Sequence, residues 1–431
     1  MYANTKFIKP LRFIMPWASR HMRIVTDLNF VDESTSEHLH GLHTYPARMH
    51  PSLARYLVKS VSVNKGIIID PFCGSGTVLL EAQLQGIESI GIDINPLAVL
   101  ISEVKTNPPS PGELALIGDL LDKILNSSYV GIPSSYEIDS HLQYWFKPNI
   151  MSKLQALRQV LEERIFPLCT ERMRKFLLVC YSSTVRQSSN LRKGEFKLYR
   201  MANDRLLAHS PEVFILFRNV LEKATIEVNE YWCLANSLHH LGQTTVIQGD
   251  STNATLYEEI RGVVTSPPYG DHPTTIAYGQ YSRLSLEMLG YDVQLVKNID
   301  HAMDLSLKAK TIKIVRSSSM ILDRIIERIM LTDQKRANDV MAYFCMLYAS
   351  MENIGGKLPP EGKVALVVGE RTVRGIRIPT PHILIELFSE LGLSIDFKHD
   401  RRILSKRLPS RNSEGDTINK ETIIIFKKQE R

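Results

Sequence analysis

The stretch 65–106 reads KGIIIDPFCGSGTVLLEAQLQGIESIGIDINPLAVLISEVKT and decides which fold the sequence predicts. Its first apolar run ends in Asp70 and a glycine-rich turn, and the apolar residues that follow have the spacing of an amphipathic helix. Gly86 ends this helix, the run 89–94 predicts a second short strand, and a second helix follows Pro96. Strands that alternate with helices at this interval predict an α/β fold with a doubly wound, mostly parallel sheet.

The same alternation returns later in the chain, after a long interruption. Four further runs rich in β-branched residues predict additional strands of this sheet, at 244–251, 262–270, 363–370 and 421–428. Two stretches interrupt the strands: 108–240 has the apolar spacing of helices, and 271–335 is basic and contains an expected helix over Met320–Met330. A basic loop, 401–415, precedes the last strand. The sequence therefore predicts one α/β sheet with two inserted segments.

Composition excludes several classes of protein. The chain has 431 residues, of which 44% are hydrophobic and 23% charged, so it is too long for one small module and shows no sign of general disorder. Its 52 Lys and Arg against 46 Asp and Glu give a net charge of +6, which suits a polyanionic partner without identifying one. No apolar run approaches the ~18–20 residues that a membrane-spanning helix needs. We therefore expect no membrane association.

The cysteines point to a reducing compartment. There are five, an odd number, and they are widely separated, with no Cys-x-x-Cys pair and no Cys/His cluster at zinc-ligand spacing. We expect a cytoplasmic protein without a structural metal. The first 26 residues are basic, as in an organellar presequence, but Pro10 and Pro16 interrupt any helix there. We interpret this segment as an N-terminal extension.

The turn DPFCGSGT at 70–77 joins the first strand to the first helix. Gly74 and Gly76 leave room for a ligand close to the backbone, although a purely structural turn would also use them. The dinucleotide fingerprint Gly-x-Gly-x-x-Gly is incomplete, which disfavours a nicotinamide dehydrogenase. Asp93 ends the next strand, where a carboxylate can accept hydrogen bonds from both ribose hydroxyls of a nucleoside, or can cap the helix that starts at Pro96. The two signals together favour a nucleoside-cofactor site.

A second motif, TSPPYG at 265–270, ends a later strand. Pro267 and Pro268 lack N–H groups and fix their own backbone angles, so the turn is rigid and its carbonyls are free to accept hydrogen bonds. Ser266 adds a hydroxyl acceptor, and Tyr269 offers a flat face for a base. A capped Pro-Pro turn would be the structural interpretation if this motif stood alone.

The two motifs together, with GIDIN and VIQGD between them, resemble those of the S-adenosylmethionine-dependent DNA amino-methyltransferases. The serine of the Ser-Pro-Pro-Tyr motif resembles the cytosine-N4 branch. The segment HTYPARMHP at 43–51 is similar to the family's loop that closes over the cofactor. The resemblance covers 43–107 and 244–290 and, more weakly, 340–428. It implies a Rossmann-like methyltransferase sheet with helical insertions.

The resemblance also implies roles for individual residues. Asp70, Gly74 and Gly76 would line the methionine part of the cofactor, Asp93 the ribose, and Asp250 the adenine amino group. The wider cofactor site that it implies comprises Tyr45, Pro46, Asp70, Pro71, Phe72, Gly74, Ser75, Gly76, Thr77, Asp93, Asn95, Asp250 and Ser251. The implied catalytic residues are Ser266, Pro267, Pro268 and Tyr269. The cofactor is S-adenosylmethionine, and no metal is expected.

Two departures from the family pattern shape the expected domain organisation. Residues 108–240 separate two cofactor strands that are consecutive in the family, so this largely helical insertion is a candidate DNA-recognition region. The catalytic domain would comprise 43–107 and 241–431, with 1–42 as an N-terminal extension and 271–335 as a second basic insertion. The adenine-N6 branch usually has an acid where this chain has Ser266, which leaves the identity of the base open.

The expected partner is double-stranded DNA. A base within a duplex must be flipped out before its amino group can react, and basic side chains would hold the phosphates. The candidate DNA contacts are Arg186, Arg192, Lys193, Lys197 and Arg200, with further basic stretches at 308–328 and 401–411. A restriction endonuclease acting on the same site is a further expected partner. The alternatives are an adenine-N6 DNA methyltransferase, an RNA base methyltransferase, and a catalytically silent nucleic-acid-binding protein.

Overall fold

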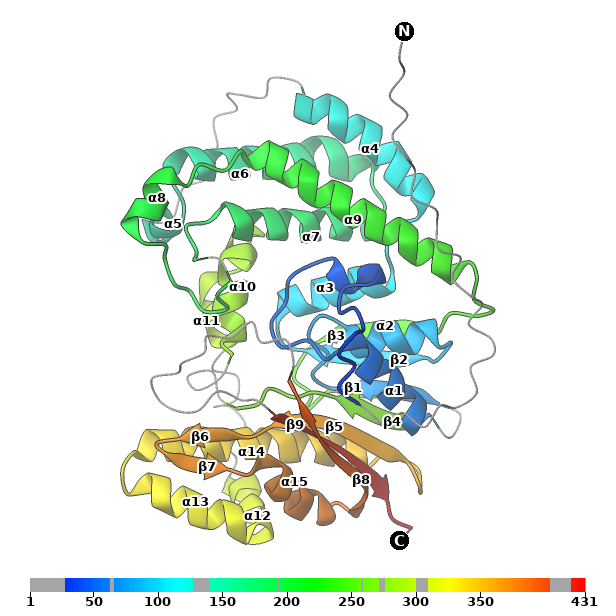
Figure 1. Cartoon of the computed structure of the whole chain (residues 1–431), viewed down its shortest axis with the longest axis vertical. Coiled ribbons are helices and arrows are strands. Elements are labelled where there is room, and N and C mark those ends of the chain that lie inside the picture. Colours follow the sequence, from blue (N-terminus) through cyan, green and yellow to red (C-terminus); the bar gives the residue numbers. More distant parts are fainter. Residues whose placement is uncertain are drawn as a thin grey trace.

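The computed structural model in Figure 1 describes most of the chain. The described residues are 28–62, 66–126, 140–192, 194–256, 259–270, 276–299, 309–403 and 420–430. Several features predicted from sequence lie outside them. These are the greater part of the N-terminal extension, Lys193, Lys308 and most of the basic loop 401–415.

The centre of the fold is a seven-stranded sheet with the strand order β3-β2-β1-β4-β5-β9-β8. Its strands are β1 (Ile67–Asp70), β2 (Ser89–Asp93), β3 (Thr244–Gln248), β4 (Ile260–Thr265), β5 (Lys363–Gly369), β8 (Leu393–Arg402) and β9 (Lys420–Lys428). The first five pair in parallel, and β9 is antiparallel to both β5 and β8. The chain leaves β1 toward β2 on one side and returns as β4 on the other, so the carboxyl ends of these strands flank a crevice where α/β sheets bind their ligands.

Helices cover both faces of the sheet because successive strand residues point to opposite sides. Ile68 packs in the core beneath α1, whereas its neighbour Ile69 packs in the core beneath α14. One face carries α1 (Pro51–Val61), α2 (Thr77–Leu84) and α3 (Pro96–Thr106). The other carries α12 (Ala309–Ser318), α13 (Met320–Met330), α14 (Gln334–Gly355) and α15 (Thr380–Ser389).

A second helical layer lies over α3, at the top of Figure 1. It contains α4 (Pro111–Asn126), α5 (Ser140–Trp145), α6 (Pro148–Val160), α7 (Glu171–Ser188), α8 (Asn203–Ala208) and α9 (Val213–Ala235). Helix α10 (Tyr278–Met288), followed by α11 (Val293–Asn298), packs against α7 and α3. Leu97 and Ile101 of α3 share one core with Leu177 of α7 and Val228 of α9. This layer therefore packs directly on the sheet-covering helices.

The structure confirms the predicted fold class and adds strands that the sequence did not predict. The expected helix over Met320–Met330 is α13, with the same bounds. Strand β8 and a small hairpin, β6 (Arg371–Val373) and β7 (Ile376–Ile378), were not predicted. Strand β8 lies at the sheet edge and is half exposed, so charged residues replace the apolar run that identifies a buried strand. Within the described residues, no helix combines the length and apolarity needed to cross a membrane.

Candidate active site

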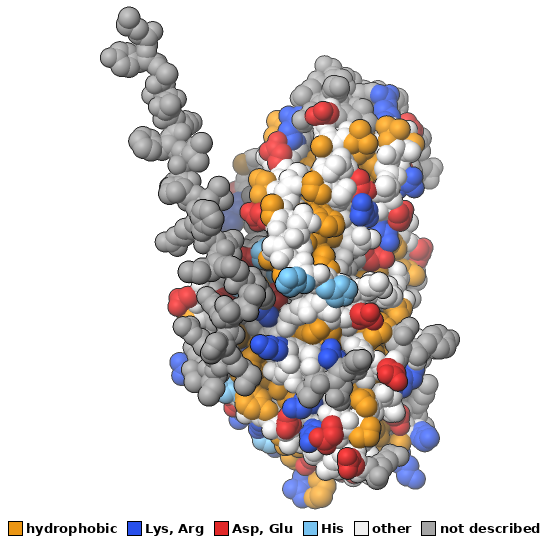
Figure 2. All heavy atoms as spheres, turned by 90° about the vertical axis from the view of Figure 1, so that its right-hand side faces the viewer, with side chains coloured by type: hydrophobic (Ala, Val, Ile, Leu, Met, Phe, Trp, Pro, Cys, Tyr) orange, Lys and Arg blue, Asp and Glu red, His pale blue; other side chains and the backbone are white. Residues whose placement is uncertain are grey.

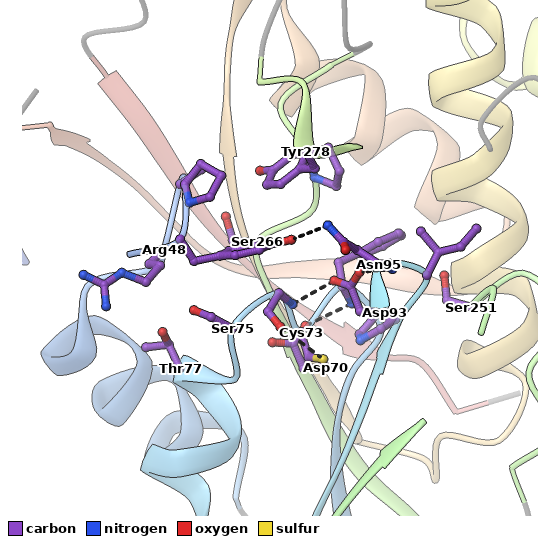
Figure 3. A pocket seen from close by; sticks show the side chains of 18 of the residues that line it. Arg48, Asp70, Cys73, Ser75, Thr77, Asp93, Asn95, Ser251, Ser266 and Tyr278 are labelled. Atoms are coloured by element: carbon purple, nitrogen blue, oxygen red, sulfur yellow. Dashed lines mark hydrogen bonds between the residues drawn. The ribbon is translucent and has the colours of Figure 1, made fainter. Parts of the chain in front are cut away.

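A cavity opens at the carboxyl ends of β1, β2 and β4, where the strand order places a ligand (Figure 3). The space between its atoms, including the part open to solvent, is about 1140 Å³. Residues expected at the site from sequence that line it are Tyr45, Pro46, Asp70, Pro71, Phe72, Gly74, Ser75, Thr77, Asp93, Asn95, Asp250, Ser251, Ser266 and Pro268. Gly76, Pro267 and Tyr269 belong to the same turns but are not among the lining residues. The structure thus brings residues from distant segments to one cavity.

The glycine-rich turn owes its shape to two residues with left-handed backbone angles. Gly74 has φ of +51° and Gly76 has φ of +76°. A side chain at Gly76 would place a Cβ atom 2.8 Å from the hydroxyl of Ser102, and that hydroxyl donates a hydrogen bond to the carbonyl of Gly74. The N–H of Cys73 also donates to the carbonyl of Ile92 on β2, at 3.0 Å. The backbone of the turn is therefore fixed against both α3 and β2.

Asp93 is held by backbone groups on either side of it. Its Oδ2 accepts from the N–H of Gly74 at 2.9 Å, and its Oδ1 accepts from the N–H of Asn95 at 2.8 Å. Each oxygen keeps a lone pair for a further donor, such as a ribose hydroxyl. Burial raises the pKa of Asp93 to about 6, although both backbone hydrogen bonds oppose the shift. A ligand that donates to this carboxylate would favour its ionised form.

Asp70 is a second carboxylate at the cavity, at the end of β1. Its Oδ1 accepts from the hydroxyl of Thr265 at 2.6 Å and from the N–H of Phe72 at 3.1 Å. Burial raises the pKa of Asp70 to about 7. Two buried carboxylates in one cavity disfavour each other's ionisation, so the cavity suits a ligand with positive charge.

The opposite side of the cavity carries basic side chains. Figure 3 shows Arg48, Ser75 and Thr77 together on the side away from Asn95 and Ser251. Behind Ser75 lies the fully buried Lys105 of α3, whose Nζ is 3.4 Å from the Ser75 hydroxyl. Burial lowers the pKa of Lys105 well below its usual value. This side suits a ligand group that accepts hydrogen bonds or carries negative charge.

Tyrosine side chains form a wall of the cavity that the sequence did not predict in full. Tyr45 lies 6.0 Å from Tyr278 and 5.7 Å from Tyr281 between ring centroids. The amide of Asn95 donates to the Tyr45 hydroxyl at 3.1 Å and to the hydroxyl of Ser282 at 2.7 Å. The side chain of Asn95 therefore ties the 43–51 loop and α10 together beside Asp93.

Sequence reasoning missed several lining residues, including Arg48, Ile94 and Tyr278. Two of them had a signal in the sequence: Arg48 lies within the 43–51 segment already singled out, and Ile94 lies within the GIDIN motif directly after Asp93. Tyr278 had none, because its helix follows residues that no motif covers. Its place at the cavity comes from the packing of α10 on α3 and α7.

Asp250 and Ser251 follow β3 and complete the far side of the cavity. Asp250 Oδ1 accepts from the N–H of Thr252 at 2.9 Å, which fixes the turn. The Ser251 hydroxyl accepts from the hydroxyl of Ser350 on α14 at 2.9 Å. Although 108–240 separates β2 from β3 in sequence, Asp93 is paired in register with Gln248, so both strand ends reach the same cavity.

The Ser-Pro-Pro-Tyr turn is held by residues far away in sequence. The Ser266 hydroxyl donates to the carbonyl of Val367 on β5 at 3.1 Å, and it lies 3.5 Å from the Tyr269 hydroxyl. The Tyr269 hydroxyl donates to Oε1 of Glu421 on β9 at 2.8 Å. Burial, followed by the negative charge of Glu421, raises the pKa of Tyr269 well above its usual value. Because its proton is directed to Val367, the Ser266 oxygen can accept from a donor in the cavity.

The residues predicted to contact DNA fall into two groups. Arg186 has an internal position: its guanidinium stacks over the Tyr281 ring at 3.8 Å, and it donates to the carbonyls of Tyr281 and Glu195 at 3.0 and 2.6 Å. This geometry argues against the predicted phosphate contact, because the guanidinium holds α10 and the 189–200 loop against α7.

The other predicted DNA contacts lie nearer the surface. Arg192 is 62% exposed, and its Nε lies 3.8 Å from the carboxylate of Glu195. The guanidinium of Arg200 stacks on the ring of Tyr144. Lys197 is half-buried, and Lys193 lies outside the described residues.

Comparison with known proteins places the chain in a family. The DNA methylase family matches residues 15–103. Across 419 residues the chain is 32% identical to the type II methyltransferase M.MvaI of Kocuria varians, a match that covers 92% of this chain and 91% of that protein. The chain therefore belongs to the S-adenosylmethionine-dependent DNA amino-methyltransferases, as its motifs predicted.

Two further relatives match only short parts of the chain. The type II methyltransferase M.MjaII of Methanocaldococcus jannaschii is 46% identical over 74 residues, which are 17% of this chain and 14% of that protein. A tRNA (guanine(10)-N2)-dimethyltransferase of Methanothermobacter thermautotrophicus is 48% identical over 52 residues, which are 12% of this chain and 16% of that protein. These matches cover too little of either chain to identify a substrate.

The cavity fits S-adenosylmethionine, which supplies an electrophilic methyl group on a sulfonium. This cofactor carries positive charge on its sulfonium and amino groups, negative charge on its carboxylate, and two ribose hydroxyls. The buried carboxylates of Asp70 and Asp93 suit the positive charges and the ribose hydroxyls. Arg48, Ser75 and the buried Lys105 suit the carboxylate. The charges of the cavity thus match those of the cofactor at both ends.

Proposed function

We propose that the protein methylates the N4 amino group of a cytosine flipped out of double-stranded DNA. The observation that carries this proposal is the position of Ser266: it directly follows β4 and lines the same cavity as Asp93 and Gly74, and its hydroxyl proton is directed to the carbonyl of Val367. An uncharged acceptor therefore faces the space beside the cofactor site. It can accept from an amino group without acting as a strong base.

The chain's own residues would activate the amino nitrogen by holding its hydrogens. An amino group conjugated to a pyrimidine ring is a weak nucleophile. Acceptors at Ser266 and at the carbonyl of Pro267 would hold both N–H bonds and favour a less conjugated nitrogen. Most of the rate enhancement would then come from positioning, with the reacting atoms held ~3–3.5 Å apart.

A nucleophilic cysteine is not part of this proposal. Cys73 lines the cavity, but it is buried, and the loss of hydration raises the pKa of its thiol well above the usual value. A buried neutral thiol is a poor nucleophile. The chemistry proposed here is direct displacement on the sulfonium methyl.

DNA contacts would come from the side of the molecule that carries α10 and the 189–200 loop. Among the described side chains of the face shown in Figure 2, the right-hand side of Figure 1, acidic and basic groups are mixed and form no large basic field. The 189–200 loop reaches α10 through Phe196, whose ring lies 6.0 Å from that of Tyr281. Arg192 of this loop is the exposed candidate for a phosphate contact. A cognate restriction endonuclease remains a prediction from sequence.

Incubation with labelled S-adenosylmethionine and plasmid DNA, followed by mass spectrometry of the digested nucleosides, tests the proposal. The expected product is N4-methylcytosine. N6-methyladenine would overturn the base assignment while leaving the reaction class intact. Label in RNA with none in DNA would support an RNA base methyltransferase instead.

A further inference from the structure

Tyr269 and Glu421 form a long-range polar contact at the Ser-Pro-Pro-Tyr turn. The Tyr269 hydroxyl donates to Glu421 Oε1 at 2.8 Å, across 152 positions of sequence. The same hydroxyl lies 3.5 Å from the Ser266 oxygen. No motif includes Glu421, and it does not line the cofactor cavity.

The topology of the sheet explains how Glu421 reaches this turn. Strand β9 runs antiparallel to β5, so its first residues lie beside the carboxyl ends of the parallel strands. Glu421 is paired with Gly369, at the carboxyl end of β5, and Val367 of the same strand accepts the Ser266 hydroxyl. Strand β9, which is antiparallel to its neighbours β5 and β8, therefore places the Glu421 carboxylate beside the Ser-Pro-Pro-Tyr turn.

Glu421 is itself held in place by its neighbours. Its side chain is 17% exposed, and its Oε2 lies 3.7 Å from Nε of Arg401, which is paired with it across β8 and β9. A carboxylate fixed in this way is a strong acceptor with one preferred position. The other end of Tyr269 is restrained by the rigid Pro267-Pro268 turn.

We propose that Glu421 is a positioning residue that orients the Tyr269 ring, and through it the turn that presents Ser266, for the target base. This inference rests on the proposed function and adds to it a residue outside the family's motifs. The carboxylate acts only as a hydrogen-bond acceptor, since the proton stays on the tyrosine.

Glu421→Ala should lower kcat for DNA methylation ~10- to 100-fold, because the ring loses a charge-assisted hydrogen bond and small misplacements are costly in catalysis. Cofactor affinity measured without DNA should be unchanged. Tyr269→Phe should produce a similar loss, and the double variant should be no worse than either single one, since both remove one contact. Losses that multiply in the double variant would overturn the proposal.

Glu421→Gln separates positioning from proton transfer. The amide oxygen still accepts from the tyrosine hydroxyl, so we expect Glu421→Gln to recover most of the lost kcat. A Gln variant as slow as the Ala variant would contradict positioning and would assign a chemical role to the charge. Thr422→Val is the matched control: it removes the neighbouring hydrogen bond on β9, 2.8 Å from Thr422 to Asp400, and should leave kcat unchanged.

A measurement that needs no turnover keeps this inference separate from the proposed function. In protein labelled with 3-fluorotyrosine, the ¹⁹F resonance assigned through Tyr269→Phe should shift in Glu421→Ala and remain in place in Thr422→Val. An unchanged resonance would disprove the contact. If the contact is present but wild-type protein methylates no DNA, the proposed function fails and the catalytic role of Glu421 fails with it.

Discussion

Two turns at the same edge of the sheet are held in opposite ways. Asp93, at the end of β2, takes its hydrogen bonds from Gly74 and Asn95, 19 and 2 positions away in sequence. Ser266 and Tyr269, after β4, depend on Val367 and Glu421, 101 and 152 positions away. The Asp93 carboxylate is therefore held by nearby sequence, and the Ser-Pro-Pro-Tyr turn by tertiary structure. Substitutions on the two sides should have separable effects.

The largest effect is expected on the cofactor side. Asp93→Ala removes the proposed ribose acceptor and leaves the N–H groups of Gly74 and Asn95 without their partner, at a cost of ~1.5–3 kcal/mol in cofactor binding. Calorimetry should show S-adenosylmethionine binding at least tenfold weaker. Asp292→Ala is a suitable control, because Asp292 also accepts from two backbone N–H groups but caps α11 instead of lining the cavity. Unchanged affinity for S-adenosylmethionine in a folded Asp93→Ala protein would contradict the proposed contact of Asp93 with the ribose.

Protonation of Asp93 and Asp70 at low pH should also weaken cofactor binding, but gradually. Burial raises the pKa of Asp93 to about 6 and that of Asp70 to about 7. Because a cationic ligand prefers the ionised carboxylates, cofactor affinity should fall as pH drops through 7 and 6, by up to ~10-fold per pH unit for each group. Binding titrations between pH 5 and 8 at constant ionic strength measure this slope. Asp93→Asn should flatten its lower part, and a pH-independent affinity would contradict the prediction.

The same carboxylates have the opposite effect on the free protein. Their pKa values lie above the ordinary value of 3.8, so the folded state binds more protons than the unfolded state between about 4 and 7. Their contribution to the stability of the ligand-free protein therefore decreases as pH rises through this window. Thermal unfolding with and without cofactor should show the largest stabilisation by cofactor above pH 7.

The contrast between local and distant contacts also explains how far the sequence could predict the molecule. The strands around Asp70 and Asp93 were predicted because each is a buried apolar run followed by a turn motif. Strand β8 was missed because an exposed edge tolerates charged residues. Glu421 lies in a predicted strand, but only the antiparallel pairing of β9 with β5 shows that it reaches Tyr269. The stacking of Arg186 on Tyr281 could not be predicted, because a basic side chain gives no sign in sequence that it packs against an aromatic ring.

On the proposed target side, Ser266 would contribute one hydrogen bond between uncharged groups. Ser266→Ala should lower methylation turnover ~3- to 10-fold, since one uncharged acceptor contributes ~0.5–1.5 kcal/mol. Cofactor affinity should remain at the wild-type value, which is the reverse of the Asp93→Ala result. Single-turnover rates with saturating DNA, compared with calorimetry, separate the two. If Ser266→Ala weakens cofactor binding as strongly as it slows turnover, the two sides of the cavity are not independent.

The smallest effect is expected at the proposed DNA surface, where a single exposed side chain is removed. Arg192→Gln should weaken DNA binding only ~2- to 5-fold near physiological salt, but it should reduce the slope of log K against log salt by ~0.9, as the loss of one phosphate contact requires. Lys223→Gln on α9 is the matched control: Lys223 is 71% exposed, compared with 62% for Arg192, and each has one glutamate neighbour, at 3.5 and 3.8 Å. The control should leave the salt slope unchanged. Equal slopes for wild type and Arg192→Gln would make Arg192 an ordinary solvated side chain and would move the search for phosphate contacts away from the 189–200 loop.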